Sequence, residues 1–460
     1  MKKKSWNRRD LLKTFGAATV GIGAIHPVIG NANSSQELFI NPKFKKPDRP
    51  VECVVLGAGG RGNVYASYAA KYPKEMKIVG VAEPITLRRE RFSEMYTIPK
   101  EHQWVTWEHA LQVPKFADAM IITMPDHLHY QPAMDCLVMD DDILLEKAIA
   151  QTWQECKDIL DQSKKYDKIV AVCHVLRYTP YFRKMKEVVD SGRLGEIVSI
   201  QHLEPVEHIH MSHSFVRGNW RNSSESTPMI LSKSCHDTDI LRWIIGKSCQ
   251  KVSSFGSLKH FTAKNAPKGS TARCTDGCSF ERDCIFSAIK LYKEKKEWLH
   301  HLALENYDDT TILKALQEGP YGKCVYHNDN DVVDNQIVNM EFEDQISVAF
   351  SMEAFSHYGG RRTRIFGTKE DLVGDENNML ITDFLTGKQE DWAPGKAREG
   401  SGHGGGDHGL VHDFLQAVSQ QDPSLLTSTI DASMESHLIG FKAEEGRLNG
   451  GKVLDTKLNN

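Results

Sequence analysis

The sequence has no surplus of charge of either sign and no apolar run long enough to span a bilayer. Its 57 Lys and Arg residues nearly balance its 61 Asp and Glu residues, which gives a formal net charge of −4. Beyond the extreme N-terminus there is no dense Lys/Arg block, the electrostatic footprint of a nucleic-acid-binding protein. These absences favour a small-molecule partner and predict neither nucleic-acid binding nor an integral membrane segment.

Internal repeats of fixed period are also missing, which argues against a solenoid or propeller. The 460 residues exceed what one hydrophobic core usually supports, so two domains of ordinary size are expected. An apolar content of 40% and a charged content of 26% are typical of globular proteins.

The N-terminus has the layout of an export signal. Arg8 and Arg9 precede Leu11 and a weakly apolar Gly/Ala-rich stretch. We interpret residues 1–32 as a twin-arginine signal peptide, which predicts a periplasmic or extracytoplasmic protein. The alternative is a cytosolic chain with a basic first turn. No Cys follows the apolar stretch, so a lipid anchor is not expected, and the polar, Pro-containing residues 33–50 are predicted to be a linker.

Strand-like and helix-like segments alternate over residues 51–175. Such alternation predicts an α/β Rossmann domain with a parallel, doubly wound sheet. The expected strands are residues 51–56, 77–82, 117–123, 142–146 and 169–172. Single cysteines within these apolar segments, such as Cys53 and Cys173, are predicted to be buried free thiols.

The alternation of strands and helices ends after residue 175. Residues 176–450 are predicted to form an α+β substrate-binding domain with a large, mostly antiparallel sheet. Its expected strands are residues 198–204, 252–258, 337–342, 347–355 and 362–367. Its expected helices are residues 181–191, 410–420 and 429–448. Residues 259–280 and 388–407 are expected to be loops, and residues 451–460 are expected to be a tail.

A glycine-rich loop follows the first predicted strand. Gly57, Gly59 and Gly62 form a GxGxxG motif that opens a helix, and Glu83 ends the next strand 26 residues after Gly57. The glycines permit a tight turn, close approach to a pyrophosphate and close helix packing, while the helix N-terminus attracts phosphate. Glu83 would accept hydrogen bonds from ribose hydroxyls, which favours NAD. NADP stays open, because Arg88 could compensate a 2′-phosphate.

Four further segments resemble the glucose-fructose oxidoreductase, inositol dehydrogenase and rhizopine-catabolism (Gfo/Idh/MocA) family. They are residues 123–129 (TMPDHLH), 145–147 (LEK), 177–180 (RYTP) and 235–243 (CHDTDILRW), and the similarity covers residues 51–450. The resemblance implies a nicotinamide at the carboxyl edge of the parallel sheet and a sugar held against the second sheet. It also implies pairing of open sheets across protomers, so a homo-oligomer is expected.

The resemblance implies roles for individual residues. Lys147 and His236 are the expected catalytic residues, since a Lys at the strand end can donate to a sugar hydroxyl and imidazole can relay its proton. The expected cofactor-binding residues are Gly57, Gly59, Gly60, Arg61, Gly62, Glu83, Arg88, Met124, Pro125, His127, His129, Glu146, Lys147 and Arg177. The expected substrate-binding residues are Tyr178, His208, His210, Lys233, His236 and His403.

Two positions depart from the family pattern. Ala148 replaces the proline of the Glu-Lys-Pro motif, which leaves the backbone geometry there open. Ser232 stands where inositol-dehydrogenase-like members have an Asp four residues before the histidine. Lys233 could supply a second cation at the sugar.

Two clusters raise the alternative of a metal. His208 and His210 would share one face of a strand and could contact sugar hydroxyls or bind Zn²⁺. Cys274, Cys278 and Cys284 could bind Zn²⁺, or form a disulfide with one free thiol, in either case stapling a long loop.

Three functions remain open on the sequence. The first is hydride transfer between a sugar carbon and tightly held NAD. The second is an NAD-dependent glycoside hydrolase that uses transient oxidation and elimination, as in exported family members with a segment like His403-Gly-Gly. The third is a non-catalytic sugar-binding protein that retains the fold.

Overall fold

The computed structural model describes residues 45, 47–393 and 403–457. The predicted signal peptide of residues 1–32 lies outside the described residues, as do residues 33–44 and 46 of the predicted linker. In the described part of the chain, no helix is both long and apolar enough to cross a membrane.

The first sheet is parallel and six-stranded, in the order β3-β2-β1-β4-β5-β6. Its strands are β1 (Val51–Leu56), β2 (Met76–Ala82), β3 (Gln103–Trp104), β4 (Ala119–Ile122), β5 (Asp142–Leu145) and β6 (Val170–Val172). Most of their residues are buried apolar side chains, because helices cover both faces of the sheet. The strand order reverses beside β1, the place where doubly wound sheets bind ligands.

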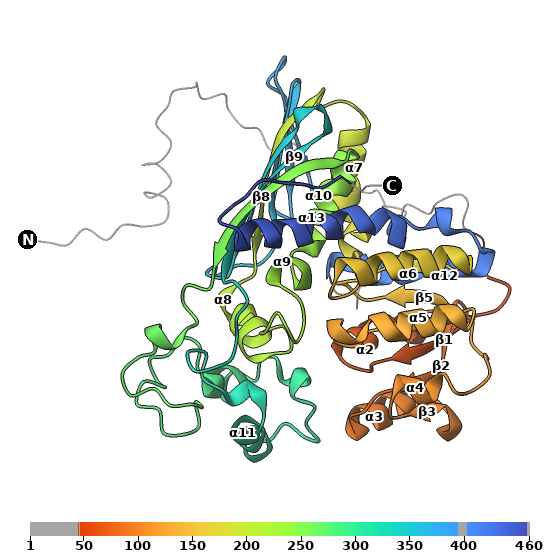
Figure 1. The fold of residues 1–460 in the computed structure, drawn as a ribbon, viewed down its shortest axis with the longest axis vertical. Coiled ribbons are helices and arrows are strands. Elements are labelled where there is room, and N and C mark those ends of the chain that lie inside the picture. Colours follow the sequence, from red (N-terminus) through yellow and green to blue (C-terminus); the bar gives the residue numbers. More distant parts are fainter. Residues whose placement is uncertain (1–44, 46, 394–402, 458–460) are drawn as a thin grey trace, which may run out of the picture. The chain divides into compact units, whose positions relative to one another are not determined.

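Two helical layers enclose this sheet (Figure 1). One core joins α2 (Gly60–Lys71), α3 (Thr86–Tyr96) and α12 (Gly406–Gln420), and the other joins α5 (Tyr130–Val138), α6 (Trp153–Lys165) and α13 (Ile430–Leu448). The helices α12 and α13 belong to the C-terminal part of the chain, yet they pack against the parallel sheet. The first domain is therefore completed by helices that follow the second domain in sequence.

The second sheet has nine strands in the order β14-β13-β12-β11-β7-β10-β9-β8-β15. Its strands are β7 (Ile197–Pro205), β8 (Cys249–Ser257), β9 (Asn335–Phe342), β10 (Ser347–Glu353), β11 (Arg362–Gly367), β12 (Glu370–Gly374), β13 (Met379–Asp383), β14 (Gln389–Trp392) and β15 (Leu454–Asp455). Among the described strands of this sheet, only β7 and β10 pair in parallel. The predicted fold class is therefore confirmed.

Helices pack on one face of this sheet and carry residues of the candidate site. The longer ones are α7 (Pro180–Asp190), α10 (Cys235–Ile245) and α13, which share one core with the buried side chains of the strands. The shorter turns near the site are η2 (Asp126–Leu128), η3 (Val175–Tyr178), α8 (His208–His210), η4 (Met211–Arg217), α9 (Met229–Ser232) and η10 (His403–Gly405), and α4 (Trp107–Ala110) lies next to β3.

The predicted loop over residues 388–407 is partly wrong. Residues Gln389–Trp392 form β14, an edge strand that pairs only with β13, and α12 already begins at Gly406. An edge strand that is only partly buried can carry polar residues such as Gln389 and Glu390, which hides it from a search for apolar alternation.

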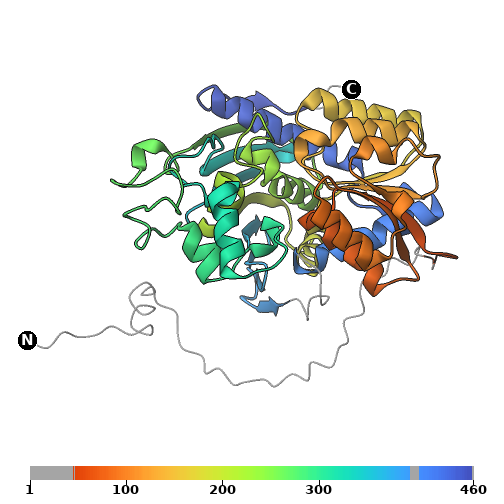
Figure 2. The ribbon, with the colours of Figure 1, turned by 90° about the horizontal axis from the view of Figure 1, so that it is seen from below.

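Residues 258–334 form a long insertion between β8 and β9, drawn in green to turquoise in Figures 1 and 2. It includes η6 (Ile289–Glu294), η7 (Leu299–Leu302) and α11 (Asp309–Glu318). The side chains of these three elements bury one another in a small core of their own. The insertion therefore has a small core of its own, while other insertion residues, such as Phe261, Phe286 and Val325, belong to the core of the antiparallel domain.

Candidate active site at the carboxyl edge of the parallel sheet

The glycine-rich loop between β1 and α2 is closed on one side by close backbone contacts. Gly57 has a φ of 100°, and a Cβ atom there would lie 3.0 Å from the carbonyl carbon of Thr123. A Cβ atom at Gly62 would lie 2.1 Å from the carbonyl oxygen of Gly57. Both positions therefore require glycine.

The side of the loop at Gly59 is less crowded. The nearest atom to a Cβ on Gly59 would be Arg88 Nη1, at 3.9 Å. Within the described residues, no side chain caps α2 at Gly59, and its first turn contains no acidic residue. The first amides of α2 thus remain available for an anion, as dinucleotide phosphates require, so the residues present fit an NAD diphosphate.

Glu83 lies beside this loop at the end of β2. Its side chain is buried, and its carboxylate accepts hydrogen bonds from the amides of Ala58 at 2.8 Å and Ile85 at 3.0 Å. These two bonds fix the carboxylate next to the glycines. Of the two neighbouring arginines, Arg89 donates to the Glu83 carbonyl, and Arg88 donates to the carbonyl of His301 at 3.3 Å.

The segment after β4 is held by hydrogen bonds to both domains. The ring of His129 contacts the carbonyl oxygens of Ala148 at 2.7 Å and Met124 at 2.9 Å. Asp126 accepts a bond from Trp220 Nε1 at 3.0 Å, and further bonds from two hydroxyl groups of the second domain. Two predicted cofactor contacts lie on this segment: Pro125 is half-buried and His127 is exposed.

Arg61 connects the phosphate loop to two carboxylates. Its guanidinium donates to Glu146 Oε1 and to Asp407 Oδ1, both at 2.6 Å, and Tyr65 also donates to Glu146 Oε1 at 2.6 Å. Burial alone would raise the pKa of Glu146, but Arg61 and Lys147 hold that pKa below its usual value. The pKa of Asp407 is likewise lowered against its burial, by Arg61 and His403. The motif Glu146-Lys147 is therefore tied to the loop by a buried ionic network.

Lys147 points from the end of β5 toward the second domain. Its Nζ donates to the carbonyl of Ser232 and lies 5.7 Å from the centre of the Trp220 ring. The peptide bond between Lys147 and Ala148 is cis. Lys147 thus bridges the parallel sheet and the turn that precedes α10.

His236 lies at the start of α10, where it faces other histidines. Its ring centre is 6.2 Å from that of His174 and 5.8 Å from that of His403. Its Nδ1 is buried and has no hydrogen-bond partner in the described structure. Burial lowers the pKa of His236 well below its ordinary value, and Lys147 and His403 lower it further. The imidazole is therefore neutral at neutral pH and able to accept a proton.

The His403 turn leads directly into α12. His403 Nδ1 lies 3.2 Å from the Asp407 carboxylate, one helical turn later. His210 is half-buried. Desolvation lowers the pKa of its ring well below the ordinary value, and Lys233, His213, His301 and His403 lower it further. Of these two histidines, His403 lies beside His236, with 5.8 Å between ring centres, whereas the His210 ring packs against Phe215 and Trp298.

Lys233 is paired within its own domain. Its Nζ lies 3.0 Å from Glu204 Oε1 at the end of β7. The positive charge expected at the sugar is therefore partly neutralised, and Lys233 retains hydrogen-bonding capacity beside a carboxylate.

The strand predicted around His208 and His210 is wrong. Both residues lie in α8, a single helical turn whose amides at Ile209 and His210 donate to the Glu207 carboxylate. The ring of His208 contacts the carbonyl of Ser356 at 3.0 Å. Glu207 directly precedes the turn and caps it, which explains the helical geometry. A pattern of alternating polar residues does not reveal such a cap.

Arg177 and Tyr178 both have structural partners at the domain junction. Arg177 forms a buried pair with Asp239, with Nε 2.7 Å from Oδ2, and also donates to two backbone carbonyls near α13. The Tyr178 hydroxyl lies 2.8 Å from Ser428 Oγ. These contacts fix the junction, and any contact with cofactor or substrate stays a prediction.

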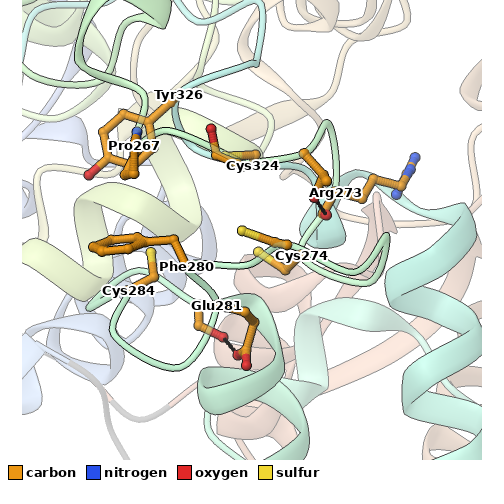
Figure 3. Close-up of a pocket in the computed structure, with 12 residues that line it drawn as sticks. Pro267, Arg273, Cys274, Phe280, Glu281, Cys284, Cys324 and Tyr326 are labelled. Atoms are coloured by element: carbon orange, nitrogen blue, oxygen red, sulfur yellow. Dashed lines mark hydrogen bonds between the residues drawn. The ribbon is translucent and has the colours of Figure 1, made fainter.

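Four cysteines line one cavity in the insertion (Figure 3). Cys324, which sequence reasoning missed, joins Cys274, Cys278 and Cys284. All four are free thiols, and no group of three or more His, Cys, Asp or Glu side chains among the described residues is arranged to hold a metal ion. The structure thus supports neither the Zn²⁺ site nor the disulfide.

Three residues near the site were not assigned a role from the sequence. Asp407 was detectable only as an acid four residues after His403, the spacing of one helical turn. Tyr65 carried no signal beyond its place in α2. His301 lies in a distant insertion, yet its Cε1 would be 3.7 Å from a Cβ on Gly60.

Two family profiles match the chain. The profile "Oxidoreductase family, NAD-binding Rossmann fold" matches residues 51–174, and "Oxidoreductase family, C-terminal alpha/beta domain" matches residues 186–441. The putative oxidoreductase YteT of Bacillus subtilis is 23% identical over 341 residues, which cover 71% of this chain and 78% of YteT. Alignments with two inositol 2-dehydrogenases of Saccharopolyspora erythraea span only 35% and 37% of those proteins.

Solved structures share the fold. An inositol dehydrogenase homolog of Azotobacter vinelandii complexed with NAD⁺ has a TM-score of 0.66 at 14% identity, covering 90% of this chain and 99% of the homolog. A levoglucosan dehydrogenase in complex with NADH and levoglucosan has a TM-score of 0.64 at 16% identity, covering 89% of this chain and 100% of that protein. With both profiles matched in order, the chain belongs to the Gfo/Idh/MocA oxidoreductase family, with its NAD-binding Rossmann fold and C-terminal α/β domain.

Proposed function

We propose that this protein is an oxidoreductase that transfers hydride between a sugar or sugar derivative and a tightly bound NAD. The observation that carries the proposal is the arrangement of one continuous site. The open phosphate loop, the Glu146-Lys147 motif and the neutral His236 are linked across the two domains by Arg61, Lys147 and the His403 turn.

The loop amides around Gly59 would hold the NAD diphosphate, and Glu83 would accept from the adenosine ribose. When bound, NAD supplies a hydride acceptor for the sugar carbon. The buried carboxylate of Glu83 favours NAD over NADP, because a 2′-phosphate there would meet a like charge. The cofactor preference remains part of the proposal, with Arg88 as the residue that NADP would need.

Lys147 and His236 carry the proton chemistry in this proposal. Lys147 Nζ donates a hydrogen bond to the reacting hydroxyl oxygen and so stabilises the negative charge that develops there. His236 accepts the hydroxyl proton, because burial and neighbouring cations keep its ring neutral. Tyr178, His208, His210, Lys233 and His403 stay the proposed sugar contacts.

One observation favours a second function, an NAD-dependent glycoside hydrolase. The turn formed by His403 lies beside His236, with Asp407 behind His403. In this reaction the sugar would give a hydride to bound NAD, a base would remove the acidified proton on the neighbouring carbon, and elimination would break the glycosidic bond. Water would then add to the unsaturated sugar before the hydride is returned. Return of the hydride leaves no net redox change. A non-catalytic sugar-binding protein is the third alternative.

One set of assays separates these functions. The purified protein is denatured and the supernatant is tested for NAD, and the native protein is incubated with sugars and with aryl glycosides without added cofactor. Reduction of bound NAD by a sugar supports the oxidoreductase, and aglycone release supports the hydrolase. An empty cofactor site, with sugar binding and no turnover, would overturn both catalytic proposals.

Export by the twin-arginine route is also a proposal. It fits a tightly held NAD, because free cofactor is scarce outside the cytoplasm. Cell fractionation of the wild type and of the double variant Arg8→Lys/Arg9→Lys tests it. We expect wild-type protein in the periplasmic fraction and the variant in the cytoplasm, whereas equal distribution would contradict export by this route.

A further inference from the structure

Residues 298–305 of the insertion, here called the strap, reach from the second domain to the dinucleotide half of the first. Arg91 on α3 donates to the strap carbonyls of Leu304 at 2.9 Å and Glu305 at 2.7 Å. Arg88 on the same helix donates to the carbonyl of His301 at 3.3 Å. Two arginines of the Rossmann domain therefore hold the backbone of a segment more than 200 residues away in the chain.

The strap lies at the phosphate loop itself. A Cβ atom on Gly60, the first residue of α2, would be 3.7 Å from His301 Cε1. Arg88 is shared between the two, since its Nη1 would lie 3.9 Å from a Cβ on Gly59. The imidazole and the guanidinium thus stand at the helix end that offers its free amides to a phosphate.

The shape of the strap is fixed by its own packing. Leu299 and Leu304 are buried in the small core of the insertion, and the His301 ring stacks on Trp298 with 5.6 Å between ring centres. Trp298 and Ala303, which flank η7, have left-handed φ values of 59° and 52°. Such conformations are costly for residues other than glycine, persist only where surrounding contacts enforce them, and are concentrated at ligand clamps and active sites.

We propose that the strap closes over the phosphate loop and retains the cofactor, with His301 as a diphosphate ligand supplied by the second domain. This inference rests on the proposed function, because it takes NAD as the group bound at the loop. Release of NAD then requires the three arginine–carbonyl bonds to open.

Dissociation of NADH tests the proposal. Protein loaded with NADH is mixed with excess ADP-ribose, and the loss of bound NADH fluorescence gives the dissociation rate. Arg91→Ala removes two strap bonds from a residue that does not touch the loop, so we expect dissociation to be about tenfold faster. His301→Ala should accelerate dissociation by a similar factor.

Arg49→Ala is the matched control. Arg49 also donates two hydrogen bonds, to Asp118, but lies on the exposed surface before β1. This variant should release NADH at the wild-type rate. Arg91→Lys keeps the positive charge but loses the paired donors, so its NADH dissociation rate should lie between those of the wild type and Arg91→Ala. It replaces Arg91→Ala if that variant is too unstable to purify.

The possible results separate the two proposals. If all variants bind NADH and release it at the wild-type rate, the strap does not retain the cofactor, and the proposed function stands. If the wild type binds no NADH, the proposed function fails and the strap proposal fails with it. Slower amide hydrogen exchange of residues 298–305 in the NADH complex would support the strap independently of activity.

Discussion

A single histidine illustrates how position changes chemistry. His236 is a titratable residue in the sequence, but in the fold it is buried beside Lys147 and His403, which keeps it uncharged at neutral pH. The same burial leaves Nδ1 without a protein partner among the described residues. A buried nitrogen without a hydrogen-bond partner costs free energy unless a ligand supplies the partner. This cost fits a role for His236 as the base that accepts a hydroxyl proton.

Replacement of His236 by Ala should lower turnover by about 10²- to 10⁴-fold, the usual contribution of a general base. Most of the bound NAD should be retained, because the phosphate loop that would hold its diphosphate is not touched. Turnover with the sugar found in the assays above and NAD content after denaturation measure both effects. His327→Ala, at an exposed residue of the insertion, is the control, and a turnover equal to that of wild type would remove His236 from the mechanism.

Buried histidines also make stability depend on pH. Burial lowers the pKa of His213 to about 3 and of His437 to about 3, and neighbouring histidines, His301 for His213 and His174 for His437, add to the shift. The unfolded chain binds these protons near pH 6.5 and the folded chain does not, so stability is full above pH 6.5 and falls as pH drops toward 3. Each histidine contributes about 1.4 kcal/mol per pH unit in that window.

Unfolding by urea at pH 7 and pH 5 measures this loss. The variant His437→Gln should reduce the difference between the two pH values, because one proton-binding site is removed from the unfolded chain. A wild-type free energy of unfolding that does not fall between pH 7 and pH 5 would contradict the assigned burial.

The positions of site residues were predictable where a motif places them at a strand end. Glu83, Glu146 and Lys147 follow buried strands, and parallel strands bring their carboxyl ends to one edge. Cys324 and His301 were not predictable, since each reaches its partners through a loop whose path no periodicity encodes.

At the scale of elements, the turn from β1 to α2 decides whether a dinucleotide can bind. Gly62→Ala would bring a Cβ within 2.1 Å of the Gly57 carbonyl oxygen, so the helix must shift away from the strand. We expect NAD affinity to fall by at least about tenfold and the unfolding midpoint to drop, measured by calorimetric titration and thermal unfolding. Gly359→Ala, which would meet no atom within 4 Å, should change neither quantity.

Many elements with clear periodicity were found, but β12 and β13 were missed although their buried residues alternate. The apolar strands β1, β4 and β5 and the helices α6 and α13 stand close to their predicted bounds, because burial dictates their residues. Glu207 instead turns His208–His210 into a helical turn through two side-chain hydrogen bonds. The polar edge strand β14 was missed for the related reason that few of its side chains are buried.

At the scale of the molecule, the nine-stranded sheet leaves apolar side chains on the face opposite its core. Phe255 and Ile337 are 56% and 47% exposed, and they pair with each other across β8 and β9. We propose that this face pairs with a second copy of the chain, because exposed apolar patches mark interfaces.

Light scattering after size-exclusion chromatography tests the pairing. The double variant Phe255→Glu/Ile337→Glu should be monomeric where the wild type is a dimer or tetramer, since four or more charges would face one another in the interface. Leu385→Glu alters a side chain that is 93% exposed and should leave the mass unchanged. A monomeric wild type would contradict the proposal.

The account depends most on where a dinucleotide binds, and a crystal structure of the protein with NAD⁺ measures that directly. We expect the diphosphate at the amides of Gly59 and Gly60, and the nicotinamide ring between Lys147 and His236, with the reacting sugar carbon able to approach it to about 3–3.5 Å. A diphosphate bound elsewhere, or a nicotinamide turned away from both side chains, would contradict the proposed chemistry.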